Sequence, residues 1–287
     1  METRRFSRYL DWFYLLSLAG VYLTGAVYAR RYNGAFYWPN LFFGFGILLA
    51  IYFAGLAQVW SSRSFQTEEP RPSGQKTLVN ARLLTLFMMG MAFAFLYTLL
   101  HAQVLIGVNL VWILAFAILS FFSTLNTITM PRNFISWVLD GFALSPFALL
   151  LGAGAQKLAP NPRLILLCAA ILLFYLAASL VRQFQMLHQD LEKKRRVLLV
   201  NMGWQRAANL ALVLSLSGYL ALAAYAYFTG TFNTIWPAFG LLAANLVQGI
   251  LFSQMADGVR PNLPLLTSTA VIQFFGILYI LIIALIR

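Results

Sequence analysis

The feature that most constrains this chain is a series of apolar stretches, each about 20 residues long, separated by short polar or turn-forming breaks. At 1.5 Å per residue, such a stretch reaches across the ~30 Å hydrocarbon core of a bilayer as a helix. The sequence therefore predicts an all-α, polytopic membrane protein, with residues 1–287 forming one domain of nine transmembrane helices. These helices are expected at about 10–29, 41–60, 83–101, 104–122, 134–155, 164–187, 207–228, 234–253 and 264–286.

Composition excludes a water-soluble fold. Of the 287 residues, 61% are hydrophobic and 10% are charged, whereas about a quarter of the residues in a soluble domain are charged. The formal charge of +12 does not indicate a nucleic-acid partner, because the cations form short clusters between the apolar stretches. The first stretch resembles the core of a signal peptide, but its length favours a retained first helix.

The cations also predict the orientation of the chain. With the N-terminus in the cytoplasm, 15 of the 20 Lys and Arg residues fall on the inner side, as the positive-inside rule requires. This arrangement places the C-terminus outside. Two inner connections, 61–82 and 183–206, are long and polar, and they are expected to cap a site at the cytoplasmic face.

The first of these connections follows a run of polar residues at four-residue spacing. A helix would stack Gln58, Ser62 and Gln66 on one face at the polar end of the bundle. These residues have a simpler interpretation as the polar end of a helix that emerges into water. Glu68 and Glu69 follow, and they either pair with nearby arginines or contribute to a metal site.

The second connection contains four consecutive cations, from Lys193 to Arg196. Mutual repulsion makes such a cluster costly unless the cations face water or phosphate groups. Two interpretations are open, namely anchoring to anionic lipid headgroups and binding of a phosphate or diphosphate. In the second interpretation, Asp190 and Glu192 support the anion through a divalent cation.

Four further residues carry groups that could be functional. Asp140, in the first turns of the expected fifth helix, either pairs with Arg132 or lines a cavity. Cys168 lies inside an apolar run, which favours a small buried hydrophobe over a reactive thiol. His101 and His188 have no companions at metal-ligand spacing, so the sequence does not indicate a zinc or haem site.

The chain resembles the intramembrane prenyltransferases of the UbiA type in architecture and in the residues that flank the motifs. Those proteins have nine transmembrane helices, an Asn-x-x-x-Asp-x-x-x-Asp motif after helix two and an Asp-x-x-x-Asp motif after helix six. Here Arg71-Pro72-Ser73-Gly74 is similar to the turn after the first motif, and the run from Asp190 to Gly203 is similar to the segment that begins at the last aspartate. Met130-Pro131-Arg132-Asn133, which leads into Asp140 and Pro146, is similar to the basic loop and fifth helix of the family.

This resemblance implies transfer of an isoprenyl group from an isoprenyl diphosphate to an acceptor, with Mg²⁺ holding the diphosphate. The motif positions here read Gln58, Ser62, Gln66, Met186 and Asp190, so one carboxylate is retained. Gln and Ser offer oxygen ligands to Mg²⁺ but no negative charge. The candidate catalytic residues are Asp190, Gln58, Ser62 and Gln66. The candidate diphosphate ligands are Arg63, Arg132, Lys193, Lys194, Arg195 and Arg196, and the candidate metal ligands are Asp190, Glu68 and Glu192.

Three functions follow as hypotheses. The first is a UbiA-like prenyltransferase, active, altered or inactive. The second is a non-catalytic relative that binds an isoprenoid, quinone or pigment, or that serves as a subunit of a membrane complex. The third, an unrelated small transporter, is the weakest, because no inverted repeat is visible and few charges lie in the membrane.

Overall fold

All regular elements of the described residues are helical in the computed structural model of this chain. The structure describes residues 12–65, 72–105, 111, 134–187, 198–259 and 261–286, with the side chains at 58–65, 72–79, 81, 136 and 186 excepted. The long helices are α2 (Trp12–Asn33), α3 (Trp38–Phe65), α4 (Pro72–His101), α8 (Pro162–Gln183), α11 (Trp204–Thr229), α13 (Leu242–Ala256) and α14 (Leu263–Ile286). The short elements are η2 (Phe184–Met186), α10 (Leu198–Met202), α12 (Phe232–Ile235) and η3 (Trp236–Leu241).

The helix predicted at 134–155 forms as three consecutive segments. These are α6 (Phe134–Phe142), the π-helical η1 (Ala143–Phe147) and α7 (Ala148–Ala155). Pro146 lies within η1, and proline has no backbone N–H to donate to the preceding turn. A single wider π turn absorbs this lost bond without ending the helix.

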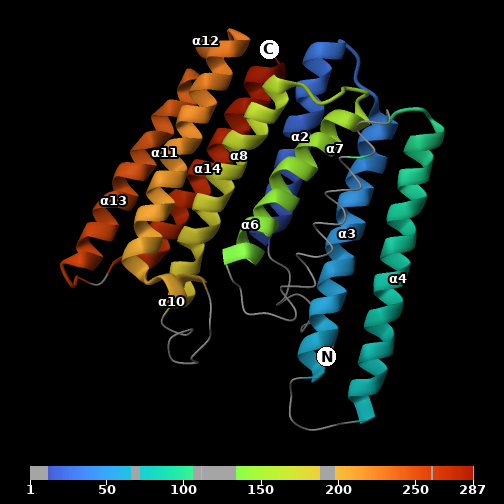
Figure 1. Cartoon of the computed structure of the whole chain (residues 1–287), viewed down its shortest axis with the longest axis horizontal. Helices are drawn as coiled ribbons and strands as arrows, with labels where there is room; N and C mark the ends of the chain where they lie inside the picture. The colour runs from blue at the N-terminus through green and yellow to red at the C-terminus, as the bar shows by residue number, and fades with distance from the viewer. Residues whose placement is uncertain are drawn as a thin grey trace.

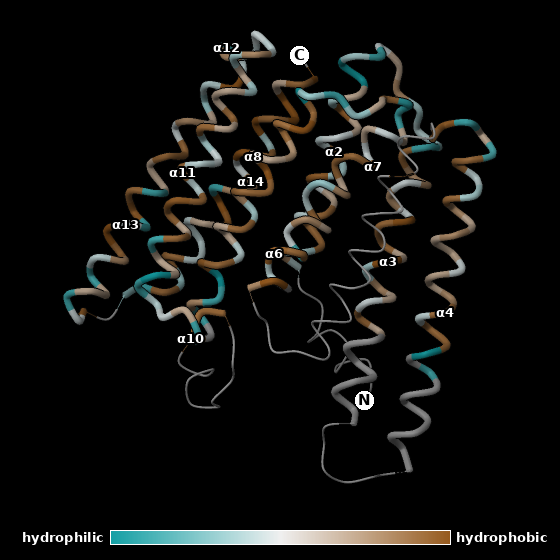
Figure 2. Tube along the Cα trace, viewed as in Figure 1, coloured by the Kyte–Doolittle hydropathy of each residue, from teal (hydrophilic) through white to brown (hydrophobic). Residues whose placement is uncertain are grey.

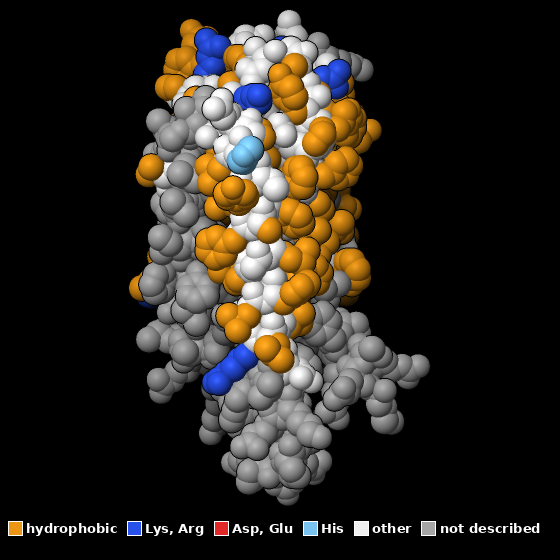
Figure 3. Space-filling model, turned by 90° about the vertical axis from the view of Figure 1, so that its right-hand side faces the viewer, with side chains coloured by type: hydrophobic (Ala, Val, Ile, Leu, Met, Phe, Trp, Pro, Cys, Tyr) orange, Lys and Arg blue, Asp and Glu red, His pale blue; other side chains and the backbone are white. Residues whose placement is uncertain are grey.

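Eight helices within the described ranges are long and apolar enough to cross a bilayer. They coincide with eight of the nine predicted stretches, and the stretch at 104–122 lies almost wholly outside the described residues. Large apolar side chains point away from the bundle, among them Leu220 and Tyr227, which are 73% and 80% exposed. Figure 3 shows apolar side chains over one face of the molecule, with Lys and Arg side chains above and below them, and Figure 2 shows mostly apolar to neutral residues along the long helices. The chain is therefore an integral, multi-pass membrane protein.

Four helix ends have the same hydrogen-bonded turn. After α4, Gln103 has a φ of 52°, and Val104 N–H donates to Leu99 O at 3.0 Å. The turns at Lys157, Gly230 and Gly258 also have a positive φ, and in each the following N–H reaches back to the last helical turn. Such a motif satisfies carbonyl groups that have no partner inside the helix. The structure ends α4 at His101, α11 at Thr229 and α13 at Ala256, where the sequence predicted ends at 101, 228 and 253.

The first inner connection contains more helix than the sequence suggested. The prediction placed a polar loop at 61–82, but α3 continues through Phe65 and α4 begins at Pro72. Residues 61–65, which extend α3 beyond its predicted end, include no proline or glycine that would stop a helix. Hydropathy marks the point where a helix leaves the hydrocarbon, which is not the point where the helix ends.

Helix α2 lies at the centre of the bundle and packs against α7 and α14. Figure 1 shows α3 and α4 on one side of it and α8, α11 and α13 on the other. The crossing of α2 and α7 is close because Gly25 lies against the backbone of Leu149, and Gly152 lies against the backbone of Tyr22. Small residues at such crossings allow two membrane helices to approach each other.

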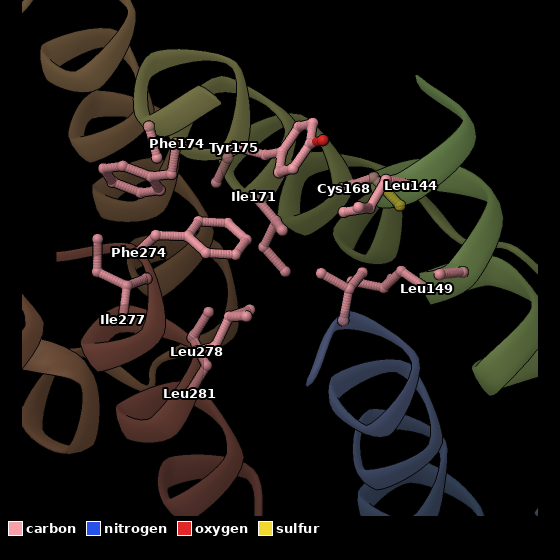
Figure 4. Packing of buried hydrophobic residues seen from close by; sticks show 14 of the residues in the cluster. Leu144, Leu149, Cys168, Ile171, Phe174, Tyr175, Phe274, Ile277, Leu278 and Leu281 are labelled. Carbon is pink, nitrogen blue, oxygen red and sulfur yellow. The ribbon is translucent and has the colours of Figure 1, made fainter. Parts of the chain in front are cut away.

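The apolar core lies between α2, α7, α8 and α14 (Figure 4). Ile171 and Phe174 of α8 face Phe274 and Leu278 of α14 there, and all four are at most 3% exposed. Cys168 is buried in the same cluster as a free thiol, which agrees with its interpretation as a small hydrophobe.

Hydrogen bonds join the helices at the end of the bundle opposite α10. Gln156, which is fully buried, accepts from Tyr37 N–H at 2.7 Å and donates to Tyr37 O at 3.1 Å. Arg31 donates to the carbonyl of Ala284 at 2.7 Å. Tyr28 donates to Asn161 Oδ1 at 3.0 Å, and the same oxygen caps α8. The turns at this end are therefore fixed to the helices beside them.

Candidate functional site

The helix ends that flank both polar connections lie at one end of the bundle. Figure 1 shows the end of α3 and the start of α4 at the lower right, the end of α8 and α10 at the lower left, and the start of α6 between these two groups and somewhat higher. Segments 66–71 and 188–197 therefore begin and finish at this end, which we call the inner end. The cytoplasmic location of this end is a prediction from charge.

Most of the predicted site residues fall outside the described part of the chain. Gln58, Ser62 and Arg63 lie in α3, and Gln58 and Ser62 are one helical turn apart. Their side chains are not described. The other predicted catalytic, diphosphate-binding and metal-binding residues lie outside the described ranges, so their convergence stays a prediction. They are Gln66, Glu68, Arg132, Asp190, Glu192, Lys193, Lys194, Arg195 and Arg196.

One cation at the inner end is placed in detail. The Cζ atom of Arg182, in the last turn of α8, lies 4.2 Å from the centroid of the Phe13 ring. Phe13 also contacts Tyr175, Phe274 and Phe275, with ring centroids 5.7–6.0 Å away. A guanidinium over an aromatic face gains a cation–π interaction, and this interaction strengthens where water is excluded. Arg182 is thus held at the boundary of the apolar core, immediately before the second polar connection.

Helices α6 and α8 are fixed to one another close to this cation. Trp137 donates its ring N–H to Ser179 Oγ at 2.7 Å, and a Cβ on Gly141 would lie 2.6 Å from a methyl group of Leu176. Asp140, the neighbour of Gly141, is half-buried on α6. Its expected partner, Arg132, lies outside the described residues, so both interpretations of Asp140 remain open.

Sequence reasoning missed a second polar cluster, which joins α11, α13 and α14 inside the membrane. We call it the amide network and define it by five buried residues: Ser215, Tyr219, Asn245, Gln248 and Gln273. Gln273 Nε2 lies 2.9 Å from Ser215 Oγ, 3.1 Å from Tyr219 Oη and 2.9 Å from Asn245 Oδ1.

Two more hydrogen bonds complete the amide network. Ser215 donates to Asn245 Oδ1 at 2.9 Å, and Gln248 Nε2 donates to Gln273 Oε1 at 3.2 Å. Amide side chains inside apolar spans are costly without partners, and this cost is the signal that could have identified them. Their pairing depends on how the three helices are rotated, which the sequence does not give.

No group of three or more His, Cys, Asp or Glu residues that could hold a metal ion occurs within the described ranges. The predicted metal ligands Asp190, Glu68 and Glu192 lie outside those ranges, so the Mg²⁺ site stays a prediction.

No protein-family model matches this chain, and no curated protein matches it.

Proposed function

We propose that this chain is a UbiA-like membrane prenyltransferase of nine helices, which binds an isoprenyl diphosphate at the inner end and transfers the isoprenyl group to an acceptor. The observation that carries the proposal is that the helix ends that flank segments 66–71 and 188–197 lie at the same end of the bundle, on two sides of α6 (Figure 1). The resemblance locates the diphosphate site at these segments and at the helix ends that precede them, with motif positions Gln58, Ser62, Gln66, Met186 and Asp190. In this proposal the inner end and the N-terminus are cytoplasmic, and the C-terminus is outside.

The surroundings of Arg182 support this location. The diphosphate of the donor is anionic, and its hydrocarbon chain is apolar, so the donor requires a cationic surface that borders an apolar one. Arg182 provides that boundary, because its guanidinium lies over Phe13 and the core cluster lies beyond Phe13. The proposed diphosphate ligands Arg63, Arg132 and Lys193 to Arg196 belong to segments that enter or leave the same end.

The proposed reaction breaks the C–O bond between the isoprenyl group and the diphosphate, and it forms a bond from that carbon to the acceptor. The acceptor gives up a proton, and the cations neutralise the diphosphate as it leaves. Mg²⁺, if bound by Asp190, Glu68 and Glu192, supplies further positive charge to the leaving group. Gln58, Ser62 and Gln66 are proposed to orient the diphosphate through hydrogen bonds.

A second candidate function is favoured by the residues at the motif positions. Gln58, Ser62, Gln66 and Met186 carry no charge, so a metal would be held by fewer carboxylates than in the family. A non-catalytic relative would keep the isoprenoid site and would bind an isoprenoid, quinone or pigment, or would serve as a subunit of a membrane complex.

A transfer assay separates the two candidates. The purified protein is incubated with radiolabelled isoprenyl diphosphates and a set of aromatic acceptors, and both transfer and donor binding are measured. A transferase gives turnover that Asp190→Ala abolishes. Asp257→Ala is the matched control, because Asp257 is exposed beyond the end of α13, and it should leave turnover unchanged.

Binding of the isoprenyl diphosphate donor tests the role of Arg182 at the boundary of the apolar core. Arg182→Gln should weaken binding of the isoprenyl diphosphate by roughly 10-fold to 100-fold, because a charge-assisted contact contributes roughly 1.5–3 kcal/mol and about 1.4 kcal/mol is a factor of ten. Arg206→Gln, at an exposed position near the start of α11, is the control and should change binding less than twofold. Donor binding without turnover would favour the non-catalytic candidate, and the absence of both would refute the proposal.

A further inference from the structure

The amide network contains a buried hydrogen-bond donor that has no partner among the described residues. Asn245 Oδ1 accepts from Ser215 and Gln273, but Asn245 Nδ2 has no partner within the described part of the chain. Tyr219 Oη accepts from Gln273, which leaves the hydroxyl hydrogen of Tyr219 available to donate. Asn245 is only 6% exposed, so a donor without a partner there carries a desolvation cost of about 1–3 kcal/mol.

The depth of the network limits what can supply the missing acceptor. Ser215, Asn245 and Gln273 each lie near the middle of a membrane span, as the bounds of those spans show. The ester carbonyls of phospholipids lie at the edge of the hydrocarbon core, about 15 Å away. An acceptor that arrives from the membrane at mid-depth must therefore belong to a molecule that dissolves in the hydrocarbon, and the alternative source is a buried water molecule.

The structure also provides an approach from the lipid. Gly249 lies one turn after Asn245 on α13, and a Cβ added to it would meet nothing within 4 Å. Gly249 is half-buried, while Leu246 and Ile250 beside it are exposed. Helix α13 lies at the edge of the bundle (Figure 1), where α11, η3 and α14 are its packing partners among the described elements. Helix α13 therefore has open space beside Gly249, one turn from Asn245, on an edge of the bundle with exposed apolar side chains.

We propose that the amide network binds a membrane-dissolved molecule through a neutral carbonyl oxygen, of the kind that a quinone carries. Asn245 Nδ2 and Tyr219 Oη donate to this oxygen, and the apolar body of the molecule lies along α13 at Gly249. An uncharged acceptor is required, because the network offers no cation to pair with an anion. This site lies at mid-depth and is independent of the diphosphate site proposed at the inner end.

Binding of a short-chain benzoquinone to the purified full-length protein in nanodiscs tests the proposal. The wild-type protein should bind the quinone saturably, and the infrared band of one quinone carbonyl should shift to lower frequency because that carbonyl accepts hydrogen bonds. Asn245→Leu should weaken binding at least tenfold and remove the shift. Gly249→Leu, which fills the open space and removes no hydrogen bond, should also weaken binding at least tenfold.

Gly240→Leu is the matched control, because a Cβ at Gly240 also meets nothing within 4 Å, but Gly240 lies in η3 and outside the network. It should change binding less than twofold. Circular dichroism and thermal unfolding show whether each variant folds, and Gly249→Leu keeps the test valid if Asn245→Leu does not fold.

Absence of saturable binding would overturn the proposal, and so would binding that neither Asn245→Leu nor Gly249→Leu weakens. An unshifted carbonyl band would also overturn it, because the donors would then be satisfied by something other than the quinone, such as a buried water molecule. Competition by monoolein would indicate an ester lipid as the occupant and would contradict the argument from depth. None of these outcomes depends on transfer from an isoprenyl diphosphate.

Discussion

Replacement of Gly25 with alanine should destabilise the fold, because the crossing of α2 and α7 has no room for a methyl group. A Cβ at Gly25 would collide with the carbonyl oxygen of Leu149 and would lie 2.9 Å from its carbonyl carbon and 3.1 Å from its Cα. These are backbone atoms of α7, and they cannot turn aside as the end of a flexible side chain can. The two helices would have to move apart, which would loosen the packing of Tyr22 and Ala26, both fully buried.

The magnitude follows from two opposing terms. Overpacking of a close-packed site costs about 1–3 kcal/mol, and a collision with rigid backbone falls at the upper end of that range. Alanine gains about 1 kcal/mol over glycine in helix propensity. The net loss in the free energy of unfolding for Gly25→Ala is therefore about 2 kcal/mol.

Gly90→Ala is the matched control within another membrane helix. A Cβ at Gly90 meets nothing within 4 Å, so this variant should be unchanged or stabilised by up to about 1 kcal/mol. Reversible unfolding in mixed micelles with increasing detergent denaturant, followed by circular dichroism, gives both free energies. Equal effects of the two substitutions would refute the packing argument, because only Gly25 faces backbone at contact distance.

Two further predictions concern the hydrogen bonds between helices. Gln273→Leu removes every hydrogen bond that Gln273 makes in the amide network. At roughly 0.6 kcal/mol per interhelical bond, this variant should lower the free energy of unfolding by about 2 kcal/mol in the same assay. An unchanged free energy of unfolding would contradict the network. Gln156→Ala should lower the free energy of unfolding by about 1–3 kcal/mol, because both backbone groups of Tyr37 lose their hydrogen-bond partner. Proteolysis at residues 34–37 should become faster in this variant. An unaltered cleavage rate there would contradict the prediction.

The sequence predicts which segments of the chain contribute to the proposed diphosphate site, but it does not predict which of their side chains come together. The four-residue spacing of Gln58 and Ser62 predicts a shared helix, and α3 contains both. Whether they meet Asp190 stays a prediction, because Asp190 lies outside the described residues. The cation–π contact of Arg182 with Phe13 joins residues far apart in the sequence, and no local pattern indicates such a pair.

The sequence by itself determined the membrane character of the chain and where most of its helices run. Runs of about 20 apolar residues must form helices in a bilayer, since each backbone group then finds its partner within the run. Neighbouring residues in the sequence also specify several turns. At Asn161-Pro162, the asparagine side chain caps the start of α8, and proline is the first residue of this helix.

Only the tertiary structure decided which helices meet and through which faces. Gly25 and Gly152 are two small residues among the 19 glycines of the chain, and their role arises from one particular crossing. Asn245, Gln248 and Gln273 look like isolated polar residues in apolar spans, and they pair because α13 and α14 are rotated toward each other. In lipid, apolar faces are nearly equivalent, so hydropathy does not specify helix rotation, whereas close packing and buried hydrogen bonds do.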